Sequence, residues 1–385
     1  MKEQLFIYDP PSTPTRAFGF LINEAVRNGK KVYRADIGMP QEPYPPWAKQ
    51  TLTTVIEQMP IAGYGPEIDP DLSRTLACFY KQRFLLPVEE EKVTKSLIVG
   101  LGASELFSLV LPLITQVGDQ ILTPDPHYPN FDIPIYMSQR NWIVGATDKN
   151  HHPQIADFKQ TLINDSEGKI KALYLNSPNN PTGAVYTKEE IKQLLELALG
   201  HKLWIIWDGV YWNYNFSDNP SSVLELIREY DQETCQAILE QLIVLDSASK
   251  IFFLCDWRLG WAMVFNPKLR RALSNAASYR GNISIQYQKA LAGIFNSPDR
   301  DQILMENRQL YQRKRDLMWQ MLQPLINDGL ITISQPPEGA IYFTLKLTNG
   351  HSAEDFLMWT LINYKEGQIT TFVPLKTKTG SFFAQ

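Results

Sequence analysis

A series of short apolar segments, separated by helical stretches, constrains the fold of this chain more than any other feature. Because these segments lack alternating polar residues, they are typical of strands buried on both faces of a sheet. A well-signalled helix lies between two of them: Thr187 and Glu190 form a capping box, and Gly200 suits the C-terminal end. Strand, helix and strand in succession predict a mainly parallel α/β sheet over roughly residues 45–285, because such crossovers are right-handed. The predicted strands are 95–99, 120–122, 172–175, 203–207 and 242–245.

The length of the chain predicts two lobes. At 385 residues it exceeds the length at which a single hydrophobic core stops growing. After the predicted sheet come a long helix, with Leu310, Leu317, Met318 and Met321 on one side, and a strand at 340–347. These elements predict a smaller α+β lobe. We expect an N-terminal segment 1–44 that packs with the small domain, a large domain 45–285 and a small domain 286–385.

Charge and composition argue against several classes of function. The chain carries 37 Lys and Arg against 41 Asp and Glu, without a basic block among aromatic residues, so no nucleic-acid partner is expected. The apolar run 106–114 is far shorter than the ~20 residues of a membrane helix, and the N-terminus does not resemble a secretory signal. Scattered Cys78, Cys235 and Cys255, with five histidines that lack ligand spacing, predict neither disulfides nor a metal site. We therefore expect a cytoplasmic enzyme.

Three polar segments follow predicted strands, where an open α/β sheet binds its ligand. One is Ser247-Ala248-Ser249-Lys250, with Arg258 eight positions after the lysine. The others are Asp208-Gly209-Val210-Tyr211 and the turn that contains Asn180-Pro181-Thr182-Gly183. At these positions the sequence resembles fold type I pyridoxal-phosphate enzymes of the class I/II aminotransferase group. The resemblance extends from about Gly38 to Pro374, and the joint occurrence of the motifs carries it.

The resemblance implies a fold, a cofactor and a reaction. The fold is a large domain with a mainly parallel, seven-stranded-type sheet sandwiched by helices, plus a smaller α+β domain. The cofactor is pyridoxal 5′-phosphate, held by Lys250 as a Schiff base, and the reaction is transamination between an amino acid and a 2-oxo acid. Lys250 would also move the substrate Cα proton, and Asp208 would keep the pyridine nitrogen protonated. Asn180 and Tyr211 would bind the ring 3-oxygen, and the substrate would contact Gly38 and Asn180.

The resemblance also implies how the rest of the cofactor is held. The phosphate would bind at a helix N-terminus, helped by a hydroxyl and a guanidinium group. Tyr128 would stack on the ring. Tyr64 would reach the phosphate of the neighbouring subunit, which implies a homodimer with shared active sites. The residues that match the phosphate site are Gly102, Ala103, Ser104, Ser247 and Arg258.

The sequence departs from the family pattern at several positions. Asp256 precedes Trp257 where the family usually has glycine, and Gly209 replaces a common glutamate. No arginine follows Arg315, whereas family members normally continue to an arginine that clamps the substrate carboxylate. Either the chain is truncated, with a small domain that is short for the family, or the carboxylate is held in another way.

The residues by themselves leave alternatives open. Lys250 could be a surface lysine, Asp208 a helix or loop cap, and Asn180 a turn former. With the same cofactor, the protein could instead be a lyase, a cyclising dehydratase or an oxidase. A cofactor-free binding module of this fold is a third hypothesis. The sequence does not identify the amino acid, because the aromatic residues near the expected mouth could line the substrate or belong to the core: Tyr33, Tyr128, Trp212 and Tyr214.

Overall fold

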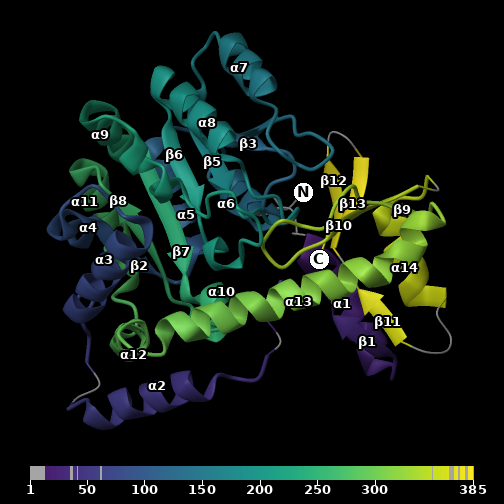
Figure 1. Cartoon of the computed structure of the whole chain (residues 1–385), viewed down its shortest axis with the longest axis horizontal. Coiled ribbons are helices and arrows are strands. Elements are labelled where there is room, and N and C mark those ends of the chain that lie inside the picture. Colours follow the sequence, from purple (N-terminus) through teal and green to yellow (C-terminus); the bar gives the residue numbers. More distant parts are fainter. Residues whose placement is uncertain are drawn as a thin grey trace, which may run out of the picture.

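The molecule consists of a large sheet covered by helices and a smaller group of strands and helices, which the long helix α13 joins (Figure 1). α13 comprises Arg300–Asn327. The computed structural model describes residues 14–34, 38–40, 42–60, 63–348, 350–363, 368–371, 373–377 and 380–384.

The large sheet has seven strands in the order β2-β8-β7-β6-β5-β3-β4. Neighbouring strands are parallel except where β8 pairs with β2 and β7, and those two pairs are antiparallel. The predicted fold class, a mainly parallel seven-stranded sheet flanked by helices, is therefore confirmed. The strands are β2 (Leu97–Gly100), β3 (Gln120–Pro124), β4 (Asn141–Gly145), β5 (Ile170–Asn176), β6 (Trp204–Asp208), β7 (Leu242–Ser247) and β8 (Gly260–Val264).

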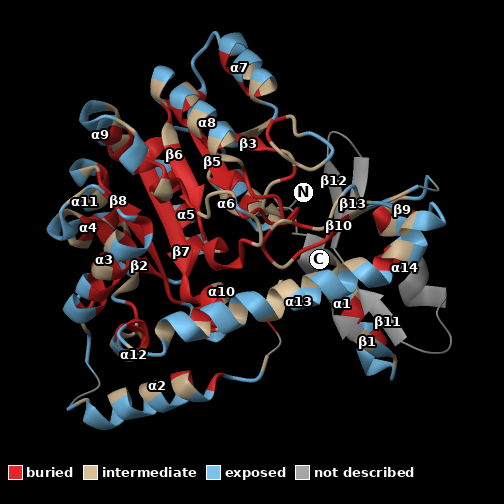
Figure 2. Ribbon diagram, in the orientation of Figure 1, coloured by how far each residue is buried: buried red, intermediate tan, exposed pale blue. Residues whose placement is uncertain are grey.

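Alternate residues of the strands enter two hydrophobic cores, one on each face of the sheet. On β6, Ile206 packs into one core, whereas Ile205 and Trp207 pack into the other. This alternation explains why the strands are continuously apolar in sequence. Figure 2 shows the buried strands between helices whose outer surfaces are exposed.

The helices divide between these two faces. The core with Ile206 lies under α5 (Ala103–Ile114), α6 (Asp132–Met137) and α11 (Pro267–Ala277). The opposite core lies under α3 (Pro70–Phe84), α4 (Glu90–Ser96), α7 (Ile155–Asn164), α8 (Lys188–Gly200), α9 (Gln232–Gln241) and α12 (Ile285–Phe295). Along the outer edge of the molecule, α2 (Pro46–Gln58) packs on α12 (Figure 1).

The smaller group contains two sheets. One is antiparallel, with the order β12-β13-β10-β9. In the other, β1 (Lys31–Arg34) pairs in parallel with β11 (Gln368–Thr371), so an N-terminal strand lies beside a C-terminal one. The remaining elements are β9 (Ile331–Thr332), β10 (Thr344–Leu347), β12 (Val373–Thr377), β13 (Gly380–Ala384), α1 (Pro14–Arg27) and α14 (Ala353–Asn363).

The structure corrects several of the element predictions. The predicted strand 95–99 begins two residues later, because Lys95 and Ser96 belong to the last turn of α4. Strands β4 and β8 were not predicted from the sequence. The predicted apolar side of the long helix is exposed: Leu317 and Met321 have 58% and 65% of their surface accessible, while Leu304 and Leu322 are the residues of α13 that are buried.

The predicted strand 340–347 is wrong in its first half. β10 begins only at Thr344. Ala340 has a φ of 55°, a left-handed conformation that does not continue a strand. Its N–H donates to the Tyr214 carbonyl oxygen at 2.9 Å. The residues before Thr344 therefore bond to loops of the large sheet and do not form a strand of the small antiparallel sheet.

Candidate active site

A cavity of about 220 Å³ opens at the carboxyl ends of β5, β6 and β7. It lies where an open, mainly parallel sheet binds its ligand. The ten residues predicted to hold a cofactor within one chain line it together: Gly102, Ala103, Ser104, Tyr128, Asn180, Asp208, Tyr211, Ser247, Lys250 and Arg258.

Lys250 lies in the one-turn helix α10 (Ala248–Ile251), directly after β7. Ser247 caps this turn by accepting a hydrogen bond from the Ser249 N–H at 3.0 Å. The Lys250 Nζ donates to the carbonyl oxygen of Gly38, which was predicted to contact the substrate. Burial lowers the pKa of Lys250. A larger fraction of the neutral amine, which is the nucleophilic form, is therefore present near neutral pH.

Asp208 ends β6 and is buried. Tyr174 Oη donates to its Oδ2 at 2.9 Å, and the Val210 N–H reaches Oδ1 at 3.4 Å. Burial raises the pKa of Asp208 to about 6, although these hydrogen bonds and the charge of Lys250 act in the opposite direction. A cation placed against this carboxylate would offset the cost of its burial, so the site favours a positively charged group beside Asp208.

Asn180 is held by the turn that follows β5. Its N–H donates to Asn176 Oδ1 at 2.6 Å, and the Asn176 amide donates to the Asp208 carbonyl oxygen at 2.8 Å. The Asn180 amide then donates to Tyr342 Oη at 3.0 Å and, more weakly, to Tyr211 Oη at 3.4 Å. The ends of β5 and β6 thus fix an amide and a phenol at one side of the cavity.

A cup lined by hydrogen-bond donors lies at the N-terminus of α5. Gly102 precedes the helix with a φ of 83° and no side-chain cap, so the first helical N–H groups are open to a ligand. A Cβ at Gly102 would lie 2.9 Å from Arg258 Nη2, which shows how closely the guanidinium approaches the helix start. The Ser247 and Ser249 hydroxyls, 2.8 Å apart, line the same cavity. Helix dipole, guanidinium and hydroxyls together suit a dianion.

Sequence reasoning missed several residues of this site. Besides Ser249, the unpredicted lining residues are Met39, Phe131, Val210 and Cys255, and Tyr174 and Tyr342 bond to lining residues. Of the two serines in the Ser-x-Ser-Lys motif, Ser247 was given a role and Ser249 was not. Tyr174 sits on β5 among apolar neighbours, and nothing in the sequence marks its bond to Asp208. Tyr342 comes from the distant C-terminal part of the chain. It was predicted to lie in a strand of the small domain and was therefore not considered as a site residue.

The remaining predicted aromatic residues lie in different places. Tyr128 lines the cavity, and its ring packs edge-on against Phe131 at 5.0 Å. Tyr64 is not part of the lining and is 96% exposed. Trp212 and Tyr214 are buried in the core and do not line the cavity. The side chain of Tyr33 lies outside the described residues.

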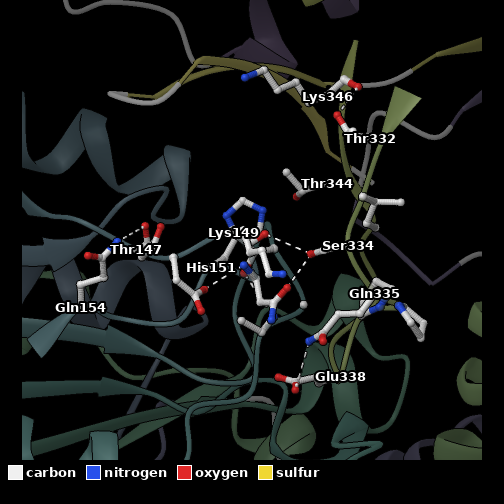
Figure 3. A pocket seen from close by; sticks show the side chains of 18 residues that line it. Thr147, Lys149, His151, Gln154, Thr332, Ser334, Gln335, Glu338, Thr344 and Lys346 are labelled. Carbon is white, nitrogen blue, oxygen red and sulfur yellow. Dashed lines mark hydrogen bonds between the residues drawn. The ribbon is translucent and has the colours of Figure 1, made fainter. Parts of the chain in front are cut away.

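A larger cavity, of about 480 Å³, lies between residues 147–154 and 332–338 (Figure 3). Its lining includes neither Lys250 nor Asp208, so it lacks the amine and carboxylate that the smaller cavity brings together. Within the described ranges, no helix is long and apolar enough to cross a membrane, and no cluster of His, Cys, Asp and Glu suits a metal ion.

Comparisons with known proteins agree with this geometry. Residues 36–372 match the family described as aminotransferase class I and II. An aspartate aminotransferase from Pyrococcus abyssi is 25% identical over 340 residues, covering 87% of this chain and 82% of that protein. An LL-diaminopimelate aminotransferase from Dehalococcoides mccartyi is 29% identical over 342 residues, covering 87% and 81%.

Solved structures share the fold. An alanine aminotransferase from Pyrococcus furiosus superposes with a TM-score of 0.83 at 22% identity, covering 97% of this chain and 92% of that one. The names of the relatives favour transamination over the elimination, cyclisation or oxidation considered from the sequence. The chain is therefore a transaminase that belongs to aminotransferase class I and II.

Proposed function

We propose that this chain binds pyridoxal 5′-phosphate in the 220 Å³ cavity and transfers an amino group from an amino acid to a 2-oxo acid. The family is generally dependent on this cofactor. The observation that carries the proposal is that the Lys250 amine, the Asp208 carboxylate and the α5 N-terminus all face one cavity.

The residues present fit each part of this cofactor. The amine of Lys250 matches its aldehyde, and the buried Asp208 matches its ring nitrogen. The uncapped start of α5, the Ser247 hydroxyl and Arg258 match its phosphate, and Tyr128 offers a ring to stack on. Asn180 and Tyr211 supply hydrogen-bond donors for its 3-oxygen.

When bound, pyridoxal phosphate supplies an aldehyde that condenses with amines and a ring that withdraws electrons from the substrate Cα. With the cofactor bound, Asp208 would hold a proton on its ring nitrogen, and Lys250 would accept the substrate Cα proton and return it within the site. Asn180 and the backbone at Gly38 position the substrate beside Lys250. These residues would together support transfer of the amino group from the donor, which becomes a 2-oxo acid, to the acceptor 2-oxo acid, which becomes an amino acid.

Cofactor attachment is tested first by spectroscopy. The purified protein should absorb near the violet edge of the visible range, and borohydride should fix the chromophore to Lys250. Lys250→Ala should lose turnover, whereas Lys268→Ala, at an exposed lysine on α11, should keep it. Full turnover by Lys250→Ala would refute the assignment.

Transamination is tested with a panel of amino acids. Release of 2-oxo acid should require an added 2-oxo acceptor in stoichiometric amount. Sustained product formation without any acceptor would indicate a lyase or an oxidase instead.

We also propose a homodimer with shared sites. Tyr64 is 96% exposed and lies beside Gly281, and the neighbouring Tyr279 is 77% exposed, so a second copy could cover this surface. Mixing Tyr64→Phe chains with Lys250→Ala chains should create one site that has both Lys250 and Tyr64. Mixed dimers without better cofactor affinity than the Tyr64→Phe parent, or a stable active monomer, would refute this.

The domain division is a proposal as well. A small domain 286–385 completed by segment 1–44 is supported by the pairing of β1 with β11. The large domain 45–285 then contains the whole seven-stranded sheet.

A further inference from the structure

The segment 338–343, which we call the crossing segment, passes over the loops of the large sheet before β10 begins. Its backbone is bonded to those loops: the Gly339 N–H donates to the Gly183 carbonyl oxygen at 2.8 Å, and the Ala340 N–H donates to that of Tyr214 at 2.9 Å. A Cβ at Gly339 would lie 2.7 Å from the Tyr214 oxygen. This close approach explains the glycine and fixes the path of the segment.

The first residue of the crossing segment is anchored by charge. Glu338, on the wall of the larger cavity in Figure 3, accepts a hydrogen bond from His152 Nε2 at 3.0 Å and from the Val185 N–H at 3.0 Å. His152 also bonds Glu190 of α8 through Nδ1 at 2.9 Å. The crossing segment is thus attached to the large sheet at both its backbone and its side chains.

The path of the crossing segment places Tyr342 beside the active site. Its side chain is buried, and its ring packs edge-on against that of Tyr211 at 5.5 Å. Its hydroxyl accepts from the Asn180 amide at 3.0 Å and forms a hydrogen bond with the Tyr211 hydroxyl. The backbone of Gly38, which accepts from Lys250, passes so close to the Tyr342 hydroxyl that no side chain fits there.

The donor and acceptor capacities of these groups allow one arrangement that leaves a proton for the cavity. A phenol donates one hydrogen and accepts up to two, whereas an amide nitrogen only donates. Among the described residues, Asn180 and Tyr211 are the two hydrogen-bond partners of Tyr342 Oη. In this arrangement Tyr342 accepts from Asn180 and donates to Tyr211, and the Tyr211 hydroxyl proton is left for a ligand in the cavity. Such a chain also polarises the last donor.

We propose that Tyr342 is a positioning residue that donates to Tyr211 and so directs the Tyr211 proton to the 3-oxygen of pyridoxal phosphate. The inference rests on the proposed function. It adds to the site a side chain from the crossing segment that acts through Tyr211 and Asn180.

The test compares two ligands, pyridoxal phosphate and 3-deoxypyridoxal 5′-phosphate, which lacks the 3-oxygen. Tyr342→Phe should weaken binding of pyridoxal phosphate to the apoprotein by about three- to tenfold, as loss of one hydrogen bond would, and should leave binding of the analogue unchanged. The visible absorbance of the bound cofactor changes with pH as the chromophore loses a proton, and the pH at which this change is half complete should also rise by about half a unit. The reason is that a weaker hydrogen-bond donor stabilises the deprotonated chromophore less.

Two further variants separate this role from a purely structural one. Tyr311→Phe removes a hydroxyl from the same apolar cluster, where it donates to Glu42 at 2.9 Å, and should change neither affinity. In a Tyr211→Phe background, adding Tyr342→Phe should cause no further loss, because the residue it acts through is already gone.

The outcomes distinguish the two proposals. Equal weakening for both ligands, or an unshifted midpoint in Tyr342→Phe, would overturn the inference alone. A wild-type protein that neither binds pyridoxal phosphate nor gains visible absorbance would refute the proposed function and the inference with it.

Discussion

Replacing His152 by alanine should destabilise the protein in a strongly pH-dependent way. His152 lies between two carboxylates, with Nδ1 2.9 Å from Glu190 and Nε2 3.0 Å from Glu338. Burial alone would lower the pKa of His152, but the hydrogen bonds and charges of the two glutamates outweigh it and raise the pKa to about 10. The folded protein therefore holds the imidazolium proton more tightly than the unfolded chain does.

The magnitude follows from this difference. A rise from 6.5 to about 10 corresponds to about 5 kcal/mol at ~1.4 kcal/mol per pH unit, which is the upper limit. Because the ion pairs also cost desolvation, we expect His152→Ala to lose about 3 kcal/mol near pH 6, or about 4 °C in Tm for a chain of this length. A raised pKa contributes stability that is complete below pH 6.5 and is lost as the pH rises through 10.

Thermal unfolding of wild type and His152→Ala at pH 6, 8 and 10 measures this directly. The gap in Tm should be widest at pH 6 and should narrow steadily toward pH 10. His201→Ala, at an exposed histidine after α8, is the control and should show almost no gap at any pH. If the difference in Tm between wild type and His152→Ala stays constant from pH 6 to pH 10, the proposed stabilisation by the charge of His152 is refuted.

Other substitutions test the site and the crossing segment. Asp208→Asn keeps the shape of the side chain, but kcat/KM should fall by at least about 100-fold, because an amide cannot hold the ring nitrogen protonated. Turnover near the wild-type rate would contradict this role. Gly102→Ala should weaken cofactor binding by roughly tenfold, because its φ of 83° disfavours a side chain and the new Cβ would meet Arg258; spectrophotometric titration of the apoprotein measures this, and unchanged affinity would contradict the cup. Gly339→Ala should lower the free energy of unfolding by about 2 kcal/mol, because the Cβ would lie 2.7 Å from the Tyr214 carbonyl oxygen; denaturant titration showing no loss would mean that the segment can move aside.

Local patterns carried much of the fold prediction. The capping box at Thr187 and Glu190 is present and begins α8, and runs such as 203–207 lie in strands because both faces of the sheet are buried. Strand β4 was not predicted, although Trp142, Ile143 and Val144 form a short apolar run; at the sheet edge these three side chains are only partly buried. β8 was missed because its direction and partners depend on the antiparallel pairing with β2 and β7.

Sequence by itself determined the parts of the site that lie on short motifs at strand ends. Lys250 and Asn180 follow strands, and Asp208 ends one. The carboxyl ends of neighbouring parallel strands meet at one edge, so the motifs predicted a shared cavity. Only the tertiary structure decided what Tyr342 and His152 contact. Tyr342 is 162 residues from Asn180 in sequence, and His152 is 186 residues from Glu338. No local spacing encodes such pairs, because they exist only once the crossing segment has packed over the loops of the large sheet.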